Sequence, residues 1–403
     1  MSVHPAPADV PARQLGVIAG AFLRLGCTSF GGPVVHLGYL REEFVVRRRW
    51  LDDAAFADIV ALCQFLPGPA SSQVVYALGM QRAGLAGALV ASACFTLPSA
   101  VLMILFAYGV IALGDLRTAG WLHGLKVAAV AVVAQAVWGM GRRLCPDAPR
   151  IALALAAATA LLLMPNAMVQ VGVIAAGAAL GWIVYRREAP TSPTAPTGLA
   201  RSHLWAAGVL CACGALLVTL PLVATAAGSQ PLAIFDSFYR AGSLVFGGGH
   251  VILPMLRAEV VPPGWIADDL FLAGYGAAQA LPGPLFTFAA YLGTVIRGGD
   301  AAWLGGLWCL LAIFLPAWML IGGALPFWHV LRSRIGTQAA LRGANAAVVG
   351  VLLAALYNPV WKEGIAGWPD ILAAAVALIV LERRLAPPWL VVILAALAGP
   401  WLL

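Results

Sequence analysis

Charged side chains are scarce in this chain. Only 10% of its 403 residues are Asp, Glu, Lys or Arg, whereas 62% are hydrophobic. A water-soluble globular domain has about 25% charged residues, so these charges are too few to cover a surface in water. Residues 83–114, 151–185, 202–235 and 301–331 contain no charge, and each stretch exceeds the roughly 20 residues of a membrane span. The sequence therefore predicts an all-α polytopic membrane protein, and the unbroken apolarity excludes an outer-membrane barrel with alternating strands.

The chain also lacks the motifs on which most enzymes and metal sites depend. It contains no GxxxxGK[ST], GxSxG or HExxH motif. Its seven cysteines are scattered and include no CxxC pair. The net charge is +7, but the basic residues form short clusters between apolar runs, which is typical of a protein oriented in a bilayer. We therefore expect no enzymatic activity, no cofactor, no metal and no nucleic-acid partner.

An internal repeat organises the sequence. Phe30, Gly31 and Gly32 recur 216 residues later as Phe246, Gly247 and Gly248. The same offset relates Arg41 and Glu43 to Arg257 and Glu259, and an offset of 215 relates Gln64, Pro67, Gly68 and Pro69 to Gln279, Pro282, Gly283 and Pro284. We interpret the chain as an N-terminal tail (1–14), a first repeat (15–185), a polar linker (186–202), an unpaired connecting transmembrane helix (203–228) and a second repeat (229–403).

The unpaired helix predicts that the repeats have opposite orientations in the membrane. One extra span between two copies with an even number of crossings inverts the second copy. The loop before Trp50 contains Arg41 and the cluster 47–49, whereas the matching loop before Trp265 keeps only Arg257. The positive-inside rule then places the first loop in the cytoplasm and its twin outside. Inverted repeats are typical of secondary transporters, whose substrate binds where the repeats meet.

Each repeat contains a Pro-Gly-Pro sequence inside an uncharged run, 59–81 in the first copy and 270–296 in the second. Two prolines around a glycine end a helix, so each run should form two half-helices of about 11–14 residues, or about 16–20 Å. Such half-helices reach only partway through a bilayer and require protein or water around them. The second half-helix begins near Ser71 and Ser72 in one copy and Thr287 in the other, which makes its positive N-terminus a candidate anion site.

The glycine-rich segments FGGP and FGGGH add a second candidate helix N-terminus in each repeat. Four N-termini would then converge on one small anion. The alternative is that these residues only permit close helix packing, which is common in membranes. The expected substrate-binding residues are Phe30, Gly31, Gly32, Gln64, Pro67, Gly68, Pro69, Ser71 and Ser72, with Gly247, Gly248, Gly249, Gln279, Pro282, Gly283, Pro284 and Thr287.

Few charged residues accompany these breaks. The guanidinium groups of Arg41 and Arg257 suit a multi-oxygen anion, although each arginine is alternatively paired with Glu43 or Glu259 to fix a loop. Lys126 either faces the transport pathway or extends to the membrane surface.

Two further groups of polar residues have more ordinary interpretations. We expect the aspartate doublets 52–53 and 268–269 to cap helices. His36, His123 and His250 are interpreted mainly as packing residues, with proton coupling as the alternative. No carboxylate is evident within a predicted span.

Three blocks resemble the chromate ion transporter family in its long, two-domain form. They are SFGGPVVHLGYLREEF from Ser29, LCQFLPGPASSQVVYALG from Leu62 and FTLPSA from Phe95. The resemblance extends over nearly the whole chain from about Leu15. It implies a multi-pass protein of the bacterial inner membrane that exports chromate and confers resistance, with sulfate as a similar dianion. The second repeat departs from the pattern at Gly249 and His250, so we expect an asymmetric site.

Electrostatics favours the outward direction. A dianion leaving a cell that is negative inside gains about 4.6 kcal/mol per 100 mV, so efflux needs no further energy source. The alternatives are an importer or channel for sulfate or another small anion, and a membrane enzyme acting on a lipid-linked substrate. Membrane lipid and a second copy of the chain, as a homodimer, are the remaining expected partners.

Overall fold

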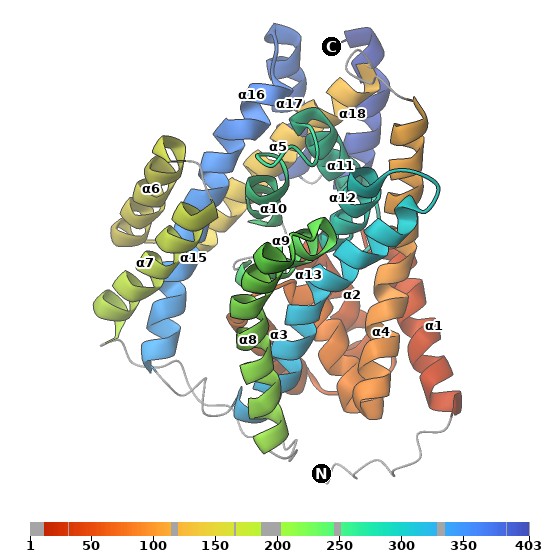
Figure 1. Cartoon of the computed structure of the whole chain (residues 1–403), viewed down its shortest axis with the longest axis vertical. Coiled ribbons are helices and arrows are strands. Elements are labelled where there is room, and N and C mark those ends of the chain that lie inside the picture. Colours follow the sequence, from red (N-terminus) through yellow and green to blue (C-terminus); the bar gives the residue numbers. More distant parts are fainter. Residues whose placement is uncertain are drawn as a thin grey trace.

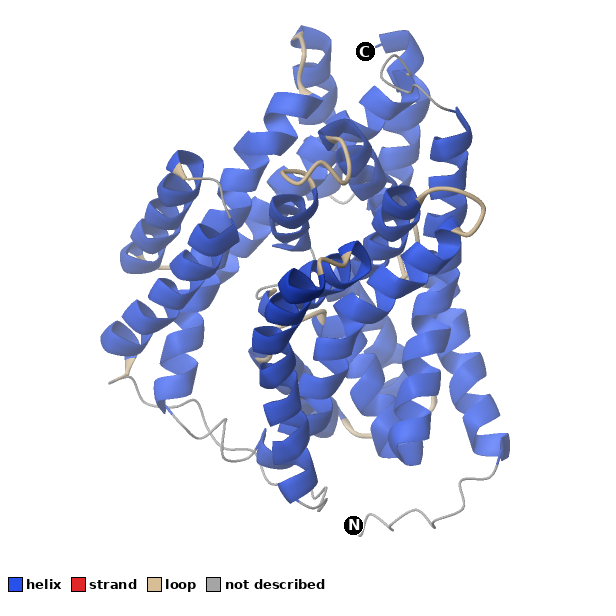
Figure 2. Cartoon of the chain, viewed as in Figure 1, coloured by secondary structure: helices blue, strands red, loops and turns tan. Residues whose placement is uncertain are grey.

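The computed structural model describes residues 12–30, 32–113, 120–164, 167–186, 203–245, 251–328, 335–383 and 385–402. Within these ranges the regular structure is helical, with no strand (Figure 2). The prediction of an all-α chain is therefore confirmed.

The first repeat is shown in red to yellow in Figure 1. It contains α1 (Ala12–Thr28), α2 (Gly32–Arg41), the π-helical segment η1 (Glu42–Arg47), α3 (Asp53–Phe65), α4 (Ala70–Leu113), α5 (Gly120–Leu144), α6 (Ala148–Leu163) and α7 (Ala167–Tyr185). Non-helical backbone angles at Ala83 and Gly84 divide α4 into two segments. The longest uncharged stretch, 151–185, holds a pair of helices, α6 and α7.

The connecting helix α8 (His203–Ala227) precedes the second repeat. That repeat contains α9 (Gln230–Leu244), α10 (Ile252–Val260), α11 (Asp268–Ala280), η3 (Leu285–Thr287), α12 (Phe288–Arg297), α13 (Ala302–Ala324), η4 (Leu325–Phe327), α15 (Ile335–Ala355), η5 (Leu356–Trp361), α16 (Lys362–Gly364), α17 (Trp368–Glu382) and α18 (Pro388–Leu402). Its helices follow the order of the first repeat, with α9 matching α1, α12 and α13 matching the two segments of α4, and α18 matching α7.

The two repeats exchange their last helices. α5 of the first repeat packs against α17 and α18 of the second, and α15 of the second packs against α6 and α7 of the first. Glycines allow these close crossings: a Cβ atom added to Gly181 would lie 2.6 Å from the carbonyl oxygen of Ala339. The reciprocal exchange joins both repeats into one core.

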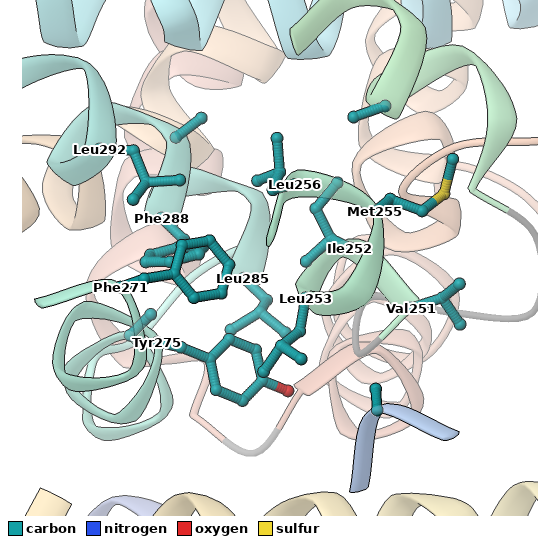
Figure 3. Packing of buried hydrophobic residues seen from close by; sticks show 14 of the residues in the cluster. Val251, Ile252, Leu253, Met255, Leu256, Phe271, Tyr275, Leu285, Phe288 and Leu292 are labelled. Atoms are coloured by element: carbon teal, nitrogen blue, oxygen red, sulfur yellow. The ribbon is translucent and has the colours of Figure 1, made fainter. Parts of the chain in front are cut away.

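Half-helices with apolar surroundings lie inside this core. α11 and α12 pack against α10 in a buried cluster of the second repeat (Figure 3). Phe271 and Phe288 meet there with their ring centroids 5.1 Å apart. α3 and α11 each have 13 residues and α12 has 10, so they reach about 15–20 Å, close to the predicted lengths.

Five described helical stretches are long and apolar enough to cross a membrane, among them 70–112, 120–144 and 204–227. α8 has the most exposed apolar surface of these, because only 11% of its most apolar window is buried. In water such a surface would be unstable, whereas lipid covers it at no cost. The chain is therefore a multi-pass membrane protein. Figure 1 shows that α1 and α8 both begin at the lower end of the molecule, while the C-terminus lies at the upper end.

Candidate functional site

The predicted break of the first repeat is present. α3 ends at Phe65, Leu66 is extended, and α4 begins at Ala70. Between these helices Gly68 has a φ of 117°, a conformation that L side chains rarely adopt. Pro67 is half-buried, while Gly68 and Pro69 are buried. The chain therefore reverses inside the protein, as the need to shield unpaired backbone groups requires.

The second repeat has the same break. α11 ends at Ala280, and η3 begins at Leu285. Gly283 between them has a φ of 97°. Pro282 and Pro284 are buried. Thr287 is buried too, and its hydroxyl donates a hydrogen bond of 2.9 Å to the carbonyl oxygen of Pro284, so it serves the turn itself.

Each break binds the other repeat through one backbone hydrogen bond. The Gly68 amide donates to the Val245 carbonyl oxygen at 2.6 Å, and the Gly283 amide donates to the Ser29 carbonyl oxygen at 2.8 Å. Ser29 and Val245 occupy equivalent positions, each directly before the FGG sequence of its repeat. The two contacts are thus a reciprocal pair, and they bring both breaks to the interface between the repeats.

Both glycines are also packed against equivalent helices. A Cβ atom added to Gly283 would lie 2.7 Å from Ser99 Oγ, and one added to Gly68 would lie 3.3 Å from the Cβ atom of Ala317. Ser99 and Ala317 directly follow the matching Leu-Pro pairs of the repeats. The breaks therefore need glycine for two reasons, the backbone angle and the close neighbour.

The first turn of α4 supplies hydrogen-bond donors at the first break. The amides that begin a helix have no acceptor within it, and the positive end of the helix dipole lies there. Ser71 and Ser72 are both 3% exposed in this turn. Gln73 is fully buried, and its Nε2 atom donates to the Pro67 carbonyl oxygen at 2.8 Å. This turn can accept a small anion, because it offers donors in a site with no carboxylate of its own.

Several buried donors beside the breaks have no partner among the residues that the structure describes. They are the hydroxyls of Ser29 and Ser72, the Nε2 atom of Gln279 and the Nε1 atom of Trp318. Ser29 adjoins the contact to Gly283, Ser72 follows the first break, Gln279 precedes the second, and Trp318 follows Ala317. Buried polar groups are normally satisfied, so these donors are candidates for hydrogen bonding to water or an oxyanion.

Phe30 and His36 support the contact at Ser29. Phe30 packs against Trp389 of α18, with ring centroids 5.5 Å apart. The Nε2 atom of buried His36 lies 3.0 Å from the Ser29 carbonyl oxygen, which also accepts from Gly283. The interpretation of His36 as a packing residue therefore agrees with its position.

Part of the predicted glycine site lies outside the described residues. Gly31, Gly247, Gly248, Gly249 and His250 belong to that part. Gly32 is the first residue of α2, so a helix does begin at the glycine sequence of the first repeat. The convergence of four helix N-termini stays a prediction.

The two predicted arginines lie at the far ends of the half-helices. Arg41 donates to Asp53 at 2.7 Å, and Arg257 makes two hydrogen bonds of 2.7 Å to Asp268. These aspartates begin α3 and α11, about 18–20 Å along the helix from the Pro-Gly-Pro turns. The structure therefore gives both arginines an aspartate partner rather than the expected glutamate, and it does not bring them to the breaks. Of the aspartates expected to cap helices, Asp52 does so for α3, whereas Ala267 is the N-cap of α11.

Lys126 and Gln64 are also separate from the turns. The Nζ atom of Lys126 on α5 lies 3.8 Å from Asp269, in the first turn of α11. Lys126 is 14% exposed and packs at the protein side of α5, so it is not a surface residue extended toward the headgroups. The side chain of Gln64 is exposed, in contrast to that of its twin Gln279.

Sequence reasoning missed a second pair of arginines. Glu43 lies 4.0 Å from Arg24, and Glu259 lies 3.5 Å from Arg240. Arg24 and Arg240 are 216 residues apart, so they are twins in the repeat. Extending the repeat alignment upstream of Ser29 would have found them. Each lies five residues, about 7.5 Å of helix, before the residue that binds the opposite break.

A buried carboxylate was missed as well. Asp236 on α9 is 4% exposed and forms an ion pair with Arg240 on the next helical turn. α9 is not among the described helices that are long and apolar enough to cross a membrane, so Asp236 does not contradict the expectation of no carboxylate within a predicted span. Asp236 was overlooked because it directly follows an uncharged stretch and marks the end of that stretch in the sequence. In the described residues no group of three or more His, Cys, Asp or Glu side chains is arranged to hold a metal ion.

Comparison with known proteins gives a consistent result. The model of the family described as chromate transporter matches residues 17–182 and 232–400. A chromate transport protein of Cupriavidus metallidurans is 27% identical over 99% of this chain and 94% of its own length. One from Pseudomonas aeruginosa is 29% identical over 82% of this chain and 77% of its own length. An uncharacterized transporter of Bacillus subtilis is 31% identical over only 41% of this chain but 93% of its own length, so it corresponds to about one repeat.

No solved structure matches the chain. The matched regions include both Pro-Gly-Pro breaks, both reciprocal contacts and both arginine-aspartate pairs, and they lie on either side of α8. From this match over most of its length, the chain belongs to the chromate transporter family.

Proposed function

We propose that this protein is a secondary transporter that exports chromate across the cytoplasmic membrane and thereby confers chromate resistance. One observation supports this most directly: each Pro-Gly-Pro turn binds the opposite repeat, so both breaks lie at the interface between the repeats. Transporters built from repeats bind their substrates at such ends. The relatives from Pseudomonas and Cupriavidus are named for chromate transport, and the similarity extends over most of each chain.

In this proposal the oxyanion lies between the two breaks. The first-turn amides of α4, the hydroxyls of Ser72 and Ser29 and the amide of Gln279 donate hydrogen bonds to it. No arginine or lysine contributes directly, so the anion is held by neutral donors and helix dipoles. Such binding is strong enough for selection and weak enough for release.

We further propose that the repeats are inverted and that they alternate access by rocking around the reciprocal contacts. The unpaired α8 and the common starting side of α1 and α8 support the inversion (Figure 1). The membrane potential drives the dianion outward with about 4.6 kcal/mol per 100 mV. A transporter driven by the membrane potential alone needs no ATP-binding motif, and this sequence contains none.

Flux measurements in everted vesicles test the proposal. We expect saturable chromate accumulation that rises with an imposed potential positive inside the everted vesicle and is inhibited by sulfate. A current that increases linearly with voltage without saturation would indicate a channel instead, and release of preloaded chromate from the vesicle lumen against the potential would indicate an importer.

A matched pair of serines tests the location of the site. Ser72 and Ser92 are both buried in α4 with unpartnered hydroxyls, but Ser92 lies beyond the division at Gly84. We expect Ser72→Ala to raise the KM for chromate by about tenfold, which is roughly the effect of losing one hydrogen bond to a charged group. The KM of Ser92→Ala should stay near the wild-type value. Equal KM values for the two variants would place the substrate elsewhere.

A further inference from the structure

A second polar cluster lies where α7 of the first repeat meets α9 and α10 of the second. Arg240 on α9 forms ion pairs with Asp236, one turn earlier, and with Glu259 on α10. The side chains of Asp236 and Glu259 are only 6% and 13% exposed. Ser237 donates a hydrogen bond to Glu259. The cluster is therefore largely removed from water.

The cluster contains two carboxylates but only one cationic side chain. Gln170 is the polar residue that α7 contributes, and the described residues of α7, α8 and α13 contain no Asp, Glu, Lys or Arg. On α10 the remaining charge, Arg257, is bound to Asp268. α11 and α15 also pack against α10. On α11 Asp269 faces Lys126, and on α15 Arg342 lies over the ring of Tyr185, at the opposite end of α7 from Gln170. With both carboxylates ionised, the single guanidinium leaves a net charge of −1 in a buried site, which is unfavourable.

The first repeat has the opposite balance at the equivalent place. There Glu43 is bound by two cations, Arg24 and Arg48, for a net charge of +1. Asp236 corresponds to Gly20, and the turn corresponding to Arg48 contains no charge in the second repeat. The excess negative charge is therefore specific to the second repeat and is not a requirement of the shared fold.

Three polar atoms of the cluster have no hydrogen-bond partner in the described part of the chain. They are Asp236 Oδ1, Arg240 Nε and Gln170 Nε2, and Gln170 is 4% exposed. A cavity of about 10 Å³ lies against Gln170, Arg240 and Glu259. It holds about one water molecule, so a tetrahedral dianion does not fit, and the negative charge would repel it. A proton neutralises the excess negative charge and is small enough for the cavity.

We propose that the two carboxylates of this cluster, Asp236 and Glu259, bind one proton between them and that this proton and the transported oxyanion bind cooperatively. Glu259, which has the longer contact to Arg240, carries the proton, while Asp236 remains paired. The inference deepens the proposed function and rests on it. Arg240 lies about 7.5 Å along α9 from Val245, the residue that binds the first break. Neutralising a negative charge bound to Arg240 favours an anion at the breaks, and the coupling is reciprocal.

The test uses the full chain in proteoliposomes at clamped zero potential. The KM for sulfate, whose charge is constant over about pH 6 to 8, is measured beside that for chromate. We expect the wild-type KM for sulfate to fall on acidification, by at most about tenfold per pH unit for one linked proton. Glu259→Gln and Asp236→Asn should remove this slope, whereas Glu43→Gln, the twin in the first repeat, should retain it.

A second measurement does not depend on transport. Infrared difference titration of the reconstituted protein should show the carbonyl band of a protonated carboxyl group, absent from Glu259→Gln. Saturable flux with no pH slope and no band would overturn the proton site and leave the proposed function standing. A dependence on sodium in place of pH would also overturn it. A band without flux of either anion would support the proton site and refute the proposed function.

Discussion

Replacing Gly283 with alanine tests the packing at the second break. The residue has a φ of 97°, and its added Cβ atom would lie 2.7 Å from Ser99 Oγ and 3.2 Å from Ser99 Cβ. A side chain at positive φ costs about 1–2 kcal/mol, and overpacking of a close contact adds about 1–3 kcal/mol. We therefore expect Gly283→Ala to reduce the free energy of unfolding by about 2–5 kcal/mol.

Gly264 provides the matched control. It also has a positive φ, 77°, but nothing lies within 4 Å of its added Cβ atom. Gly264→Ala should thus lose only the backbone part, about 1–2 kcal/mol. The two variants are compared by thermal unfolding of the purified proteins in one detergent, with size-exclusion chromatography as the readout of the folded fraction.

The double variant Gly283→Ala/Ser99→Ala separates the two costs. Removing Ser99 Oγ relieves the closest contact, so it should recover about 1 kcal/mol or more of the loss, a non-additive effect expected of neighbours. Gly283→Ala with the stability of Gly264→Ala, or a double variant no more stable than Gly283→Ala, would refute the packing described at this break.

Two further predictions concern charged residues outside the breaks. Arg257→Ala should destabilise the protein by about 1–3 kcal/mol, because it leaves Asp268 unpaired at a half-buried contact of two hydrogen bonds. Arg41→Ala removes the equivalent but exposed ion pair, so it should change the unfolding temperature little. Equal shifts of the unfolding temperature in the two variants would contradict this difference. In the turn between α5 and α6, hydrogen bonding from Arg150 lowers the pKa of Asp147 to about 2. Its stabilising contribution should be complete above about pH 4 and lost as the pH falls toward 2, so unfolding temperatures of wild type and Asp147→Asn should converge there.

The helix breaks could be predicted because their cause is local. Proline and glycine act on their own backbone, so the Pro-Gly-Pro sequences predicted both the interruptions and the lengths of the half-helices. Scarcity of charge predicted the apolar helices for a similar reason. Neither prediction needed to know what surrounds each segment.

Partners distant in the sequence could not be predicted in this way. The contact of Gly68 with Val245 depends on how the repeats pack, and no local pattern indicates it. The alternative that Arg41 and Arg257 pair with the glutamate two residues away was wrong, because each binds an aspartate at the start of the next helix instead. Asp236 was missed because uncharged stretches were examined and their ends were not.

The central claim is that both broken helices form one oxyanion site between the repeats. An electron microscopy map of the protein in lipid nanodiscs with chromate tests it most directly. We predict density for the bound oxyanion between the turns at Gly68 and Gly283, within hydrogen-bond distance of the first turn of α4. Density at the Arg41–Asp53 or Arg257–Asp268 pairs, with the space between the turns empty, would contradict the account.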